Sequence, residues 1–213
     1  MSDVPSGSPG ANHRPAGPPI TLVTVPGLHG SDDTHWQTWL EEQVKRAVRV
    51  RQRGRDAAQL GAWSEAVRHA LAEISGAVVL ASHGFGCLAT AHALSHLPHG
   101  AFYLPGATVL GVLMVAPGSP EGFRSAGAFD ARRLDVPSVV IGSTTDPWMP
   151  IEKARNLAQR WNSAFVNLGD AGHIDASAGF GPWPLARHAI ETFARQVSTD
   201  DRRVSVAEVS QKR

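Results

Sequence analysis

The stretch ASHGFGC, residues 81–87, is the first candidate for acyl-transfer chemistry in this chain. It lies between an apolar run and a helical pattern, and small residues stand two positions before and two positions after Gly84. This spacing is typical of a nucleophile elbow, a sharp strand-to-helix turn that exposes one reactive side chain. The backbone N–H of Phe85 would then point at a developing oxyanion. Gly84 stands at the nucleophile position, so the frame predicts a catalytic turn without an attacking group.

Asp146 and His173 are the candidates for the acid and the base. Asp146 follows the run PSVVIGS and His173 follows the run AFVNL, so each is expected just beyond the end of a strand. The order of elbow, acid and histidine is that of triad hydrolases built on an α/β sheet. A carboxylate at Asp146 would hold the tautomer of His173 and stabilise its charged form. Asp170 and Asp175 flank the histidine and are the competing acids, ranked below Asp146.

A second oxyanion donor is expected in the loop VPGLHGSDDTHWQTW, which follows the first apolar run. The backbone N–H of Leu28 or His29 is the candidate, because in such sheets this loop contributes to the oxyanion hole. The glycines Gly27 and Gly30 would let the backbone approach a substrate oxygen. A tight turn before the first helix explains these glycines nearly as well.

The elements that must position these residues alternate along the chain. Helical patterns run over about 35–47, 58–74, 85–97, 150–161 and 183–197, and apolar runs stand at 20–25, 48–52, 77–82, 108–115, 137–143 and 164–168. Near-continuous apolar runs are typical of a parallel sheet covered on both faces. We therefore predict an α/β fold with a doubly wound, mainly parallel sheet of about six strands, flanked by helices. Ligands of such sheets bind beyond the carboxyl ends of the strands.

Length and composition indicate one globular domain. The chain has 213 residues, of which 42% are hydrophobic, and its formal net charge is +1. We expect a leader without stable structure over 1–19, one domain over 20–197 and a flexible tail over 198–213. The near-zero charge argues against binding of nucleic acid, and no apolar run is long enough for a membrane span. A single cysteine and the lack of a signal peptide favour a cytoplasmic protein.

Other residues that could bind ligands also have plainer roles. His92, His96 and His99 could suggest a metal site, but a proline breaks the helix before the third histidine and no carboxylate or cysteine accompanies them. We therefore predict no metal. The glycines around Gly84 match neither the P-loop nor the G-x-G-x-x-G pattern of nucleotide-binding sites, so we also predict no cofactor. Trp148 and Trp183 stand beside the candidate acid and base. Either they line an apolar pocket or they simply pack.

Taken together, these motifs resemble the small single-domain serine hydrolases of the α/β-hydrolase fold, the family of the retinoblastoma-binding serine hydrolase and its bacterial relatives. The resemblance covers about residues 20–197 and rests on VPGLHGSDDTHWQTW, SHGFGC, STTDPWMP and GHIDASAGFGPWP. It implies a minimal hydrolase with little lid that acts on small esters or amides, with Asp146 as acid and His173 as base. In that family, the position of Gly84 is normally serine.

The chain departs from this family at a second place. Relatives usually carry an acidic and an aromatic residue where this chain has Gly54 and Arg55, in a loop that helps to shape the active site. The L-x-C-x-E pattern associated with retinoblastoma binding is absent around Cys87, so the family name implies no protein partner, and the partner stays unknown.

Without a hydroxyl at position 84 no acyl-enzyme can form there, so the chain is expected to be nearly inactive toward esters. Three routes could restore some activity: Ser82 as a substitute, a water activated by His173, or Cys87. A small ester or acyl compound is the expected ligand. The alternatives are a noncatalytic binding or regulatory protein on the same fold, and an α/β protein that only resembles a hydrolase.

Overall fold

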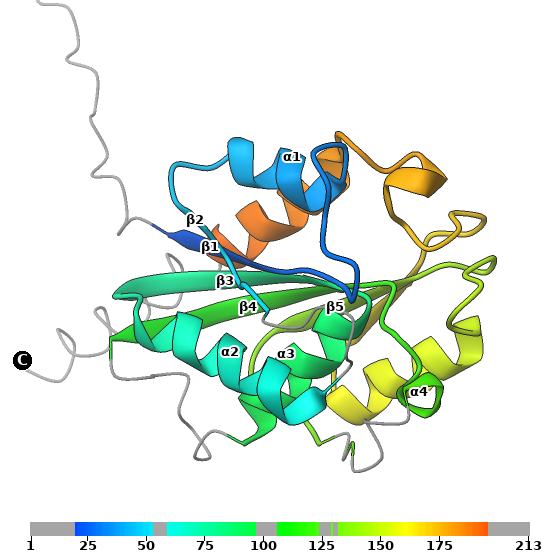
Figure 1. Ribbon diagram of the computed structural model, residues 1–213, viewed down its shortest axis with the longest axis horizontal. Coiled ribbons are helices and arrows are strands. Elements are labelled where there is room, and N and C mark those ends of the chain that lie inside the picture. Colours follow the sequence, from blue (N-terminus) through cyan, green and yellow to red (C-terminus); the bar gives the residue numbers. More distant parts are fainter. Residues whose placement is uncertain (1–19, 53–58, 97–105, 124–128, 130–131, 196–213) are drawn as a thin grey trace, which may run out of the picture.

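A six-stranded parallel sheet forms the centre of the molecule (Figure 1). The computed structural model describes residues 20–52, 59–96, 106–123, 129 and 132–195. The strand order is β2-β1-β3-β4-β5-β6, and every pair of neighbours is parallel. The strands are β1 (Thr21–Val25), β2 (Ala47–Arg49), β3 (Gly76–His83), β4 (Ala107–Val115), β5 (Ser138–Gly142) and β6 (Ala164–Asn167).

Helices cover both faces of this sheet, as a doubly wound fold requires (Figure 1). On one face lie α2 (Leu60–Ala72), α3 (Phe85–Ser95) and α4 (Ile151–Trp161). On the other face lie α1 (Trp36–Glu42) and the helix over residues 184–195. The predicted fold class is confirmed, because the sheet is parallel and is flanked by helices on its two sides.

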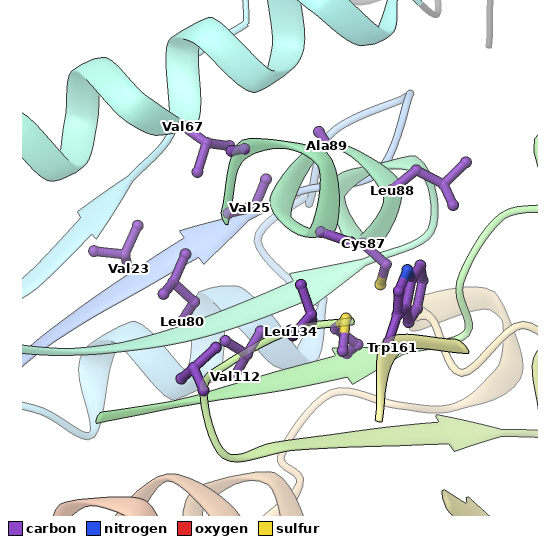
Figure 2. Close-up of a cluster of buried hydrophobic side chains, with 14 of the residues drawn as sticks. Val23, Val25, Val67, Leu80, Cys87, Leu88, Ala89, Val112, Leu134 and Trp161 are labelled. Atoms are coloured by element: carbon purple, nitrogen blue, oxygen red, sulfur yellow. The ribbon is translucent and has the colours of Figure 1, made fainter. Parts of the chain in front are cut away.

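The core on the α3 side explains why the central runs are apolar (Figure 2). Val23, Leu80 and Val112 come from three neighbouring strands, and each is inaccessible to solvent. They pack with α3, whose residues Phe85–Thr90 are buried without interruption. A helix that is apolar on almost every side must be covered on almost every side. The elbow that starts α3 therefore rests on a rigid base.

On the opposite face, one glycine lets a helix approach the sheet closely. A Cβ added to Gly111 of β4 would lie 2.3 Å from the ring of Phe193, on the helix over 184–195. Such a distance is incompatible with any side chain, so the glycine makes room for the aromatic ring. This contact fixes the last helix of the described chain against the sheet centre.

The observed elements agree with the predicted ones except near the sheet edge. The helix predicted over 35–47 ends at Glu42, and β2 begins at Ala47, where the prediction had 48. Edge-strand pairing explains the early end, because the amide of Leu22 in β1 donates to the carbonyl of Arg46 at 3.0 Å. The residues before β2 therefore join the sheet and cannot continue the helix. The proposed leader and tail lie outside the described residues.

No helix within the described part of the chain is long and apolar enough to cross a membrane. The longest of these helices, α2, has 13 residues. About 20 apolar residues are needed for a helical span.

Candidate active site

The candidate nucleophile elbow is the turn between β3 and α3. Gly84 adopts φ 53° and ψ −124°, a region that side chains other than glycine enter only with strain. Two residues later, a Cβ on Gly86 would lie 2.4 Å from the carbonyl oxygen of Val25 and 2.5 Å from that of Pro26. Only glycine therefore allows α3 to begin against the end of β1. Gly86 therefore has a packing reason that does not depend on catalysis.

Asp146 and His173 are brought together by the loops after β5 and β6. His173 Nδ1 lies 3.0 Å from both Oδ1 and Oδ2 of Asp146. The Asp146 side chain is 2% exposed and also accepts the backbone N–H of Trp148 at 2.9 Å. An ionised carboxylate can only accept, so the proton of the neutral imidazole is on Nδ1. Nε2 of His173 then carries the lone pair that a general base needs.

The elbow and the histidine meet at position 84. A Cβ built on Gly84 would lie 3.5 Å from His173 Nε2 and 3.5 Å from Gly27 Cα, both ordinary van der Waals distances. A one-carbon side chain would therefore fit without displacing a neighbour, and a hydroxyl on that carbon would be within hydrogen-bonding reach of Nε2. Gly84, His173 and Asp146 thus lie each within contact distance of the next, in the order in which a nucleophile, a base and an acid would be placed.

Two buried side chains hold the backbone at the candidate base and at the residue that follows it. His83 Nε2–H donates to the carbonyl oxygen of His173 at 2.9 Å, and Trp36 Nε1–H donates to that of Ile174 at 3.0 Å. Ile174 has a φ of 51°, a rare conformation for a β-branched residue. Neither positioning residue was predicted from the sequence. The position of His83 directly before the elbow was the only available signal.

Burial keeps two histidines of this cluster neutral. Desolvation lowers the pKa of His83 to about 3, with smaller contributions from the charges of His173 and His35. Desolvation also lowers the pKa of His35 to about 4. His35 Nδ1 accepts the N–H of Gln37 and caps α1, so the proton of neutral His35 lies on Nε2. No partner for that Nε2 is found among the described residues.

These pKa values predict a loss of stability in mild acid. The folded pKa of His35 and His83 lies below the unfolded value of about 6.5, so the unfolded chain binds more protons as the pH falls below 6.5. We expect the free energy of unfolding to fall by about 2 to 4 kcal/mol between pH 7 and pH 5 for the pair. Denaturant melts across this range measure it.

His35→Asn is the matched control for this effect, because asparagine also caps a helix N-terminus but does not titrate. The variant should lose roughly half of the pH-dependent destabilisation. An unchanged pH slope in this variant would contradict the assignment of His35 as a buried neutral histidine.

A pocket of about 870 Å³ opens beside the elbow. Leu28, His29 and Phe85, the three candidate oxyanion donors, all line it. The first N–H groups of a helix have no intrahelical acceptor, so the amide of Phe85 at the start of α3 is available to a ligand. Trp148 lines the same pocket and is 67% exposed.

Trp183 does not line this pocket, which corrects the expectation that it stands at the pocket wall. It is buried in the core below α1, where its ring centroid lies 5.4 Å from that of Trp36 and 5.3 Å from that of Phe180. The physical reason is that the loop after His173 folds back over α1, with the amide of Trp36 donating to the carbonyl of Phe180 at 2.9 Å. Trp183 is thereby carried into the core.

The competing acids make other bonds. Asp170 accepts the hydroxyl of Thr145 at 2.7 Å, and Asp175 accepts the hydroxyl of Ser177 at 2.6 Å and the N–H of Ala178 at 3.0 Å. Asp175 therefore caps the short 3₁₀ turn Ala176–Ala178. Neither carboxylate has a hydrogen bond to His173, which leaves Asp146 as its acid partner.

The two alternative nucleophiles are also engaged elsewhere. Ser82 is buried and shares a hydrogen bond of 2.8 Å with Thr90. Cys87 is buried in the cluster of Figure 2, where its thiol lies 3.4 Å from the carbonyl of Val115, and burial raises its pKa. A thiol in that state is not a nucleophile. The loop with Gly54 and Arg55 lies outside the described residues.

Comparisons with known proteins agree with this geometry. The family profile of serine hydrolases matches residues 22–192. The chain belongs to the serine hydrolase family. No match to a curated protein was found.

Solved structures place this serine hydrolase family member among the α/β-hydrolases. A protein described as a YdeN-like hydrolase from Pectobacterium atrosepticum is 37% identical, with a TM-score of 0.74 over 83% of this chain and 91% of that chain. The ydeN gene product of B. subtilis is 18% identical, with a TM-score of 0.69 over 84% of this chain and 100% of that chain. An esterase from Rhodococcus is 16% identical, with a TM-score of 0.54 over 73% of this chain and 84% of that chain. The two more distant structures support the fold alone.

Proposed function

We propose that this serine hydrolase family member binds small esters or acyl compounds in the pocket beside Gly84, and that it forms no acyl-enzyme. The observation that carries the proposal is the joint position of Asp146, His173 and Gly84, with the built Cβ of residue 84 at 3.5 Å from His173 Nε2. A base and an acid partner are in place, whereas the chain has no hydroxyl for the base to activate. The expected outcome is binding with very slow turnover.

The lining of the pocket favours a neutral acyl group. Leu28, Phe85, Phe123 and Trp148 contribute apolar surface, and the amides of the elbow and of the loop at 27–30 offer hydrogen-bond donors for a carbonyl oxygen. An apolar wall with a few convergent donors suits a short alkyl chain that ends in a carbonyl group.

A noncatalytic binding or regulatory role on the same fold is the second candidate. The specific observation in its favour is the conformation of Gly84, because a glycine at φ 53° carries none of the strain that a serine would. The glycine therefore stabilises the elbow and keeps the pocket intact. Tight binding of a cellular acyl compound without any turnover would favour this second role.

The experiment that tests the binding site uses the native chain and hexanamide, a neutral acyl ligand. We expect hexanamide to shift the NMR resonances of the His173 ring, and Trp148→Ala to weaken that binding several-fold. A fluorophosphonate probe should not label the native chain. Leu185→Ala, a change at an exposed apolar residue outside the pocket, is the matched control and should leave binding unchanged. Labelling of the native chain, or equal effects of the two variants, would refute the proposal.

A further inference from the structure

The space beside Gly84 has the size and the surroundings of a site for a nucleophilic water. Apart from its two neighbours in the chain, the described atoms within 4 Å of a Cβ built on Gly84 are His173 Nε2 and Gly27 Cα, both at 3.5 Å. A water cannot occupy the Cβ point itself, which lies one covalent bond from Gly84 Cα, but on the pocket side of that point it can contact Gly84 Cα and lie within hydrogen-bonding distance of His173 Nε2. The pocket of about 870 Å³ includes both residues in its lining, so a substrate carbonyl can reach the same point.

The imidazole is prepared to take a proton from such a water. Asp146 holds the proton of His173 on Nδ1 with two contacts of 3.0 Å, so the unprotonated Nε2 faces position 84. The bonds from His83 and Trp36 to the carbonyls of His173 and Ile174 hold the backbone that carries the ring. General-base catalysis needs this combination of a fixed lone pair and a nearby proton.

We propose that the native chain hydrolyses activated short-chain esters directly, with a water at position 84 as the nucleophile and no covalent intermediate. The proposal rests on the proposed function, because it uses the same pocket and the same acid and base. It adds an activity of its own that does not require a hydroxyl on the protein.

The reaction proceeds through addition of water to the carbonyl carbon and then loss of the leaving group. As the water oxygen bonds to the carbonyl carbon, one water proton passes to His173 Nε2 and the C=O π electrons move to the oxygen, which becomes an oxyanion facing the amide of Phe85. When the C=O bond re-forms, the C–O bond to the leaving group breaks. The proton on Nε2 then passes to the departing alkoxide, and the products are a carboxylic acid and an alcohol. His173 returns to its neutral state.

Other hydroxyls around the pocket do not compete for this role. Ser119 donates to Glu121, Ser177 donates to Asp175 and Thr145 donates to Asp170. None of these hydroxyls has a hydrogen bond to His173 among the described contacts. Hydrolysis by the native chain is therefore expected to use water, at about 10³ to 10⁴ times the uncatalysed rate.

The test measures hydrolysis of p-nitrophenyl butyrate by the native chain, Gly84→Ala and His173→Gln. The native chain should turn over slowly without a burst of p-nitrophenol, since no acyl-enzyme accumulates. Gly84→Ala puts a methyl group into the space against which the water packs, so it should displace the water and reduce the rate at least tenfold. His173→Gln should reduce it about 100-fold or more. Lys153→Gln, a change in a surface ion pair outside this pocket, is the matched control and should leave the rate unchanged.

A second measurement keeps the proposal testable if Gly84→Ala fails to fold. Intact mass spectra of the native chain, quenched during turnover, should show no added acyl group. An acyl adduct, a burst, or an unchanged rate in folded Gly84→Ala would overturn the proposal. If the native rate equals that of buffer while Gly84→Ser is active, this inference fails and the proposed function stands. If Gly84→Ser is also inert, the catalytic interpretation of the site fails with it.

Discussion

Gly84→Ser is expected to raise the kcat for p-nitrophenyl butyrate at least about 10³-fold, toward the roughly 10⁶-fold that a serine nucleophile contributes in serine hydrolases. The reason is geometric, because apart from its neighbours in the chain a Cβ at position 84 meets no described atom closer than 3.5 Å, and His173 Nε2 is one of the two atoms at that distance. A fluorophosphonate probe should label the variant at position 84 only. Steady-state kinetics and peptide mass spectrometry measure the two effects.

The same substitution should cost stability. A serine at φ 53° and ψ −124° carries strain of about 1 to 3 kcal/mol, which for a domain of this size lowers the Tm by several degrees. Gly84→Ala has the same strain without the hydroxyl, so it should lose Tm without gaining activity. Equal activity of the serine and alanine variants, or labelling at another residue, would show that position 84 is not the nucleophile position.

Asp146→Asn, made in the Gly84→Ser background, is expected to lower kcat about 10⁴-fold, as the equivalent change does in other triad enzymes. The asparagine amide no longer accepts the Nδ1 proton through two equivalent oxygens, so the imidazole loses the tautomer that leaves Nε2 unprotonated. The bond from the Trp148 amide can still be accepted by the asparagine oxygen, so the Tm should change little. Kinetics and thermal melts separate the two effects.

Asp170→Asn in the same background is the matched control. Asp170 lies three residues before His173 and accepts the Thr145 hydroxyl, but it has no hydrogen bond to the histidine. Its loss should change kcat by no more than about threefold. A large loss at Asp170 with a small loss at Asp146 would reverse the assignment of the acid.

The catalytic chemistry expected of this site depends on the residue at position 84, whereas the fold of the site does not depend on that residue. The requirement for glycine at residue 86 comes from the carbonyls of Val25 and Pro26, and that packing would hold with any small residue at 84. The elbow, the acid and the base therefore form without a nucleophile. This independence is why a single substitution is expected to have so large an effect on activity.

Much of the fold followed from the sequence because its signals are local. Near-continuous apolar runs predicted the parallel strands, and the runs at 77–82 and 108–115 became the two central strands, buried on both faces. The order of Gly84, Asp146 and His173, each just after a strand, predicted that their loops would meet at one edge of the sheet, since parallel strands end on the same side. Their short distances agree with that prediction.

The residues that hold His173 in place could be found only in the tertiary structure. His83 reaches its carbonyl from 90 positions away, and Trp36 reaches the next carbonyl from 138 positions away. The periodicity of a segment describes the faces of its own element and carries no information on such partners. For the same reason the sequence ranked Asp146 ahead of two competing acids without excluding them, and it left open whether Trp183 lines the pocket or packs. The meeting of the loops after β5 and β6 pairs Asp146 with the histidine, and the fold of the later loop over α1 buries Trp183 against Trp36.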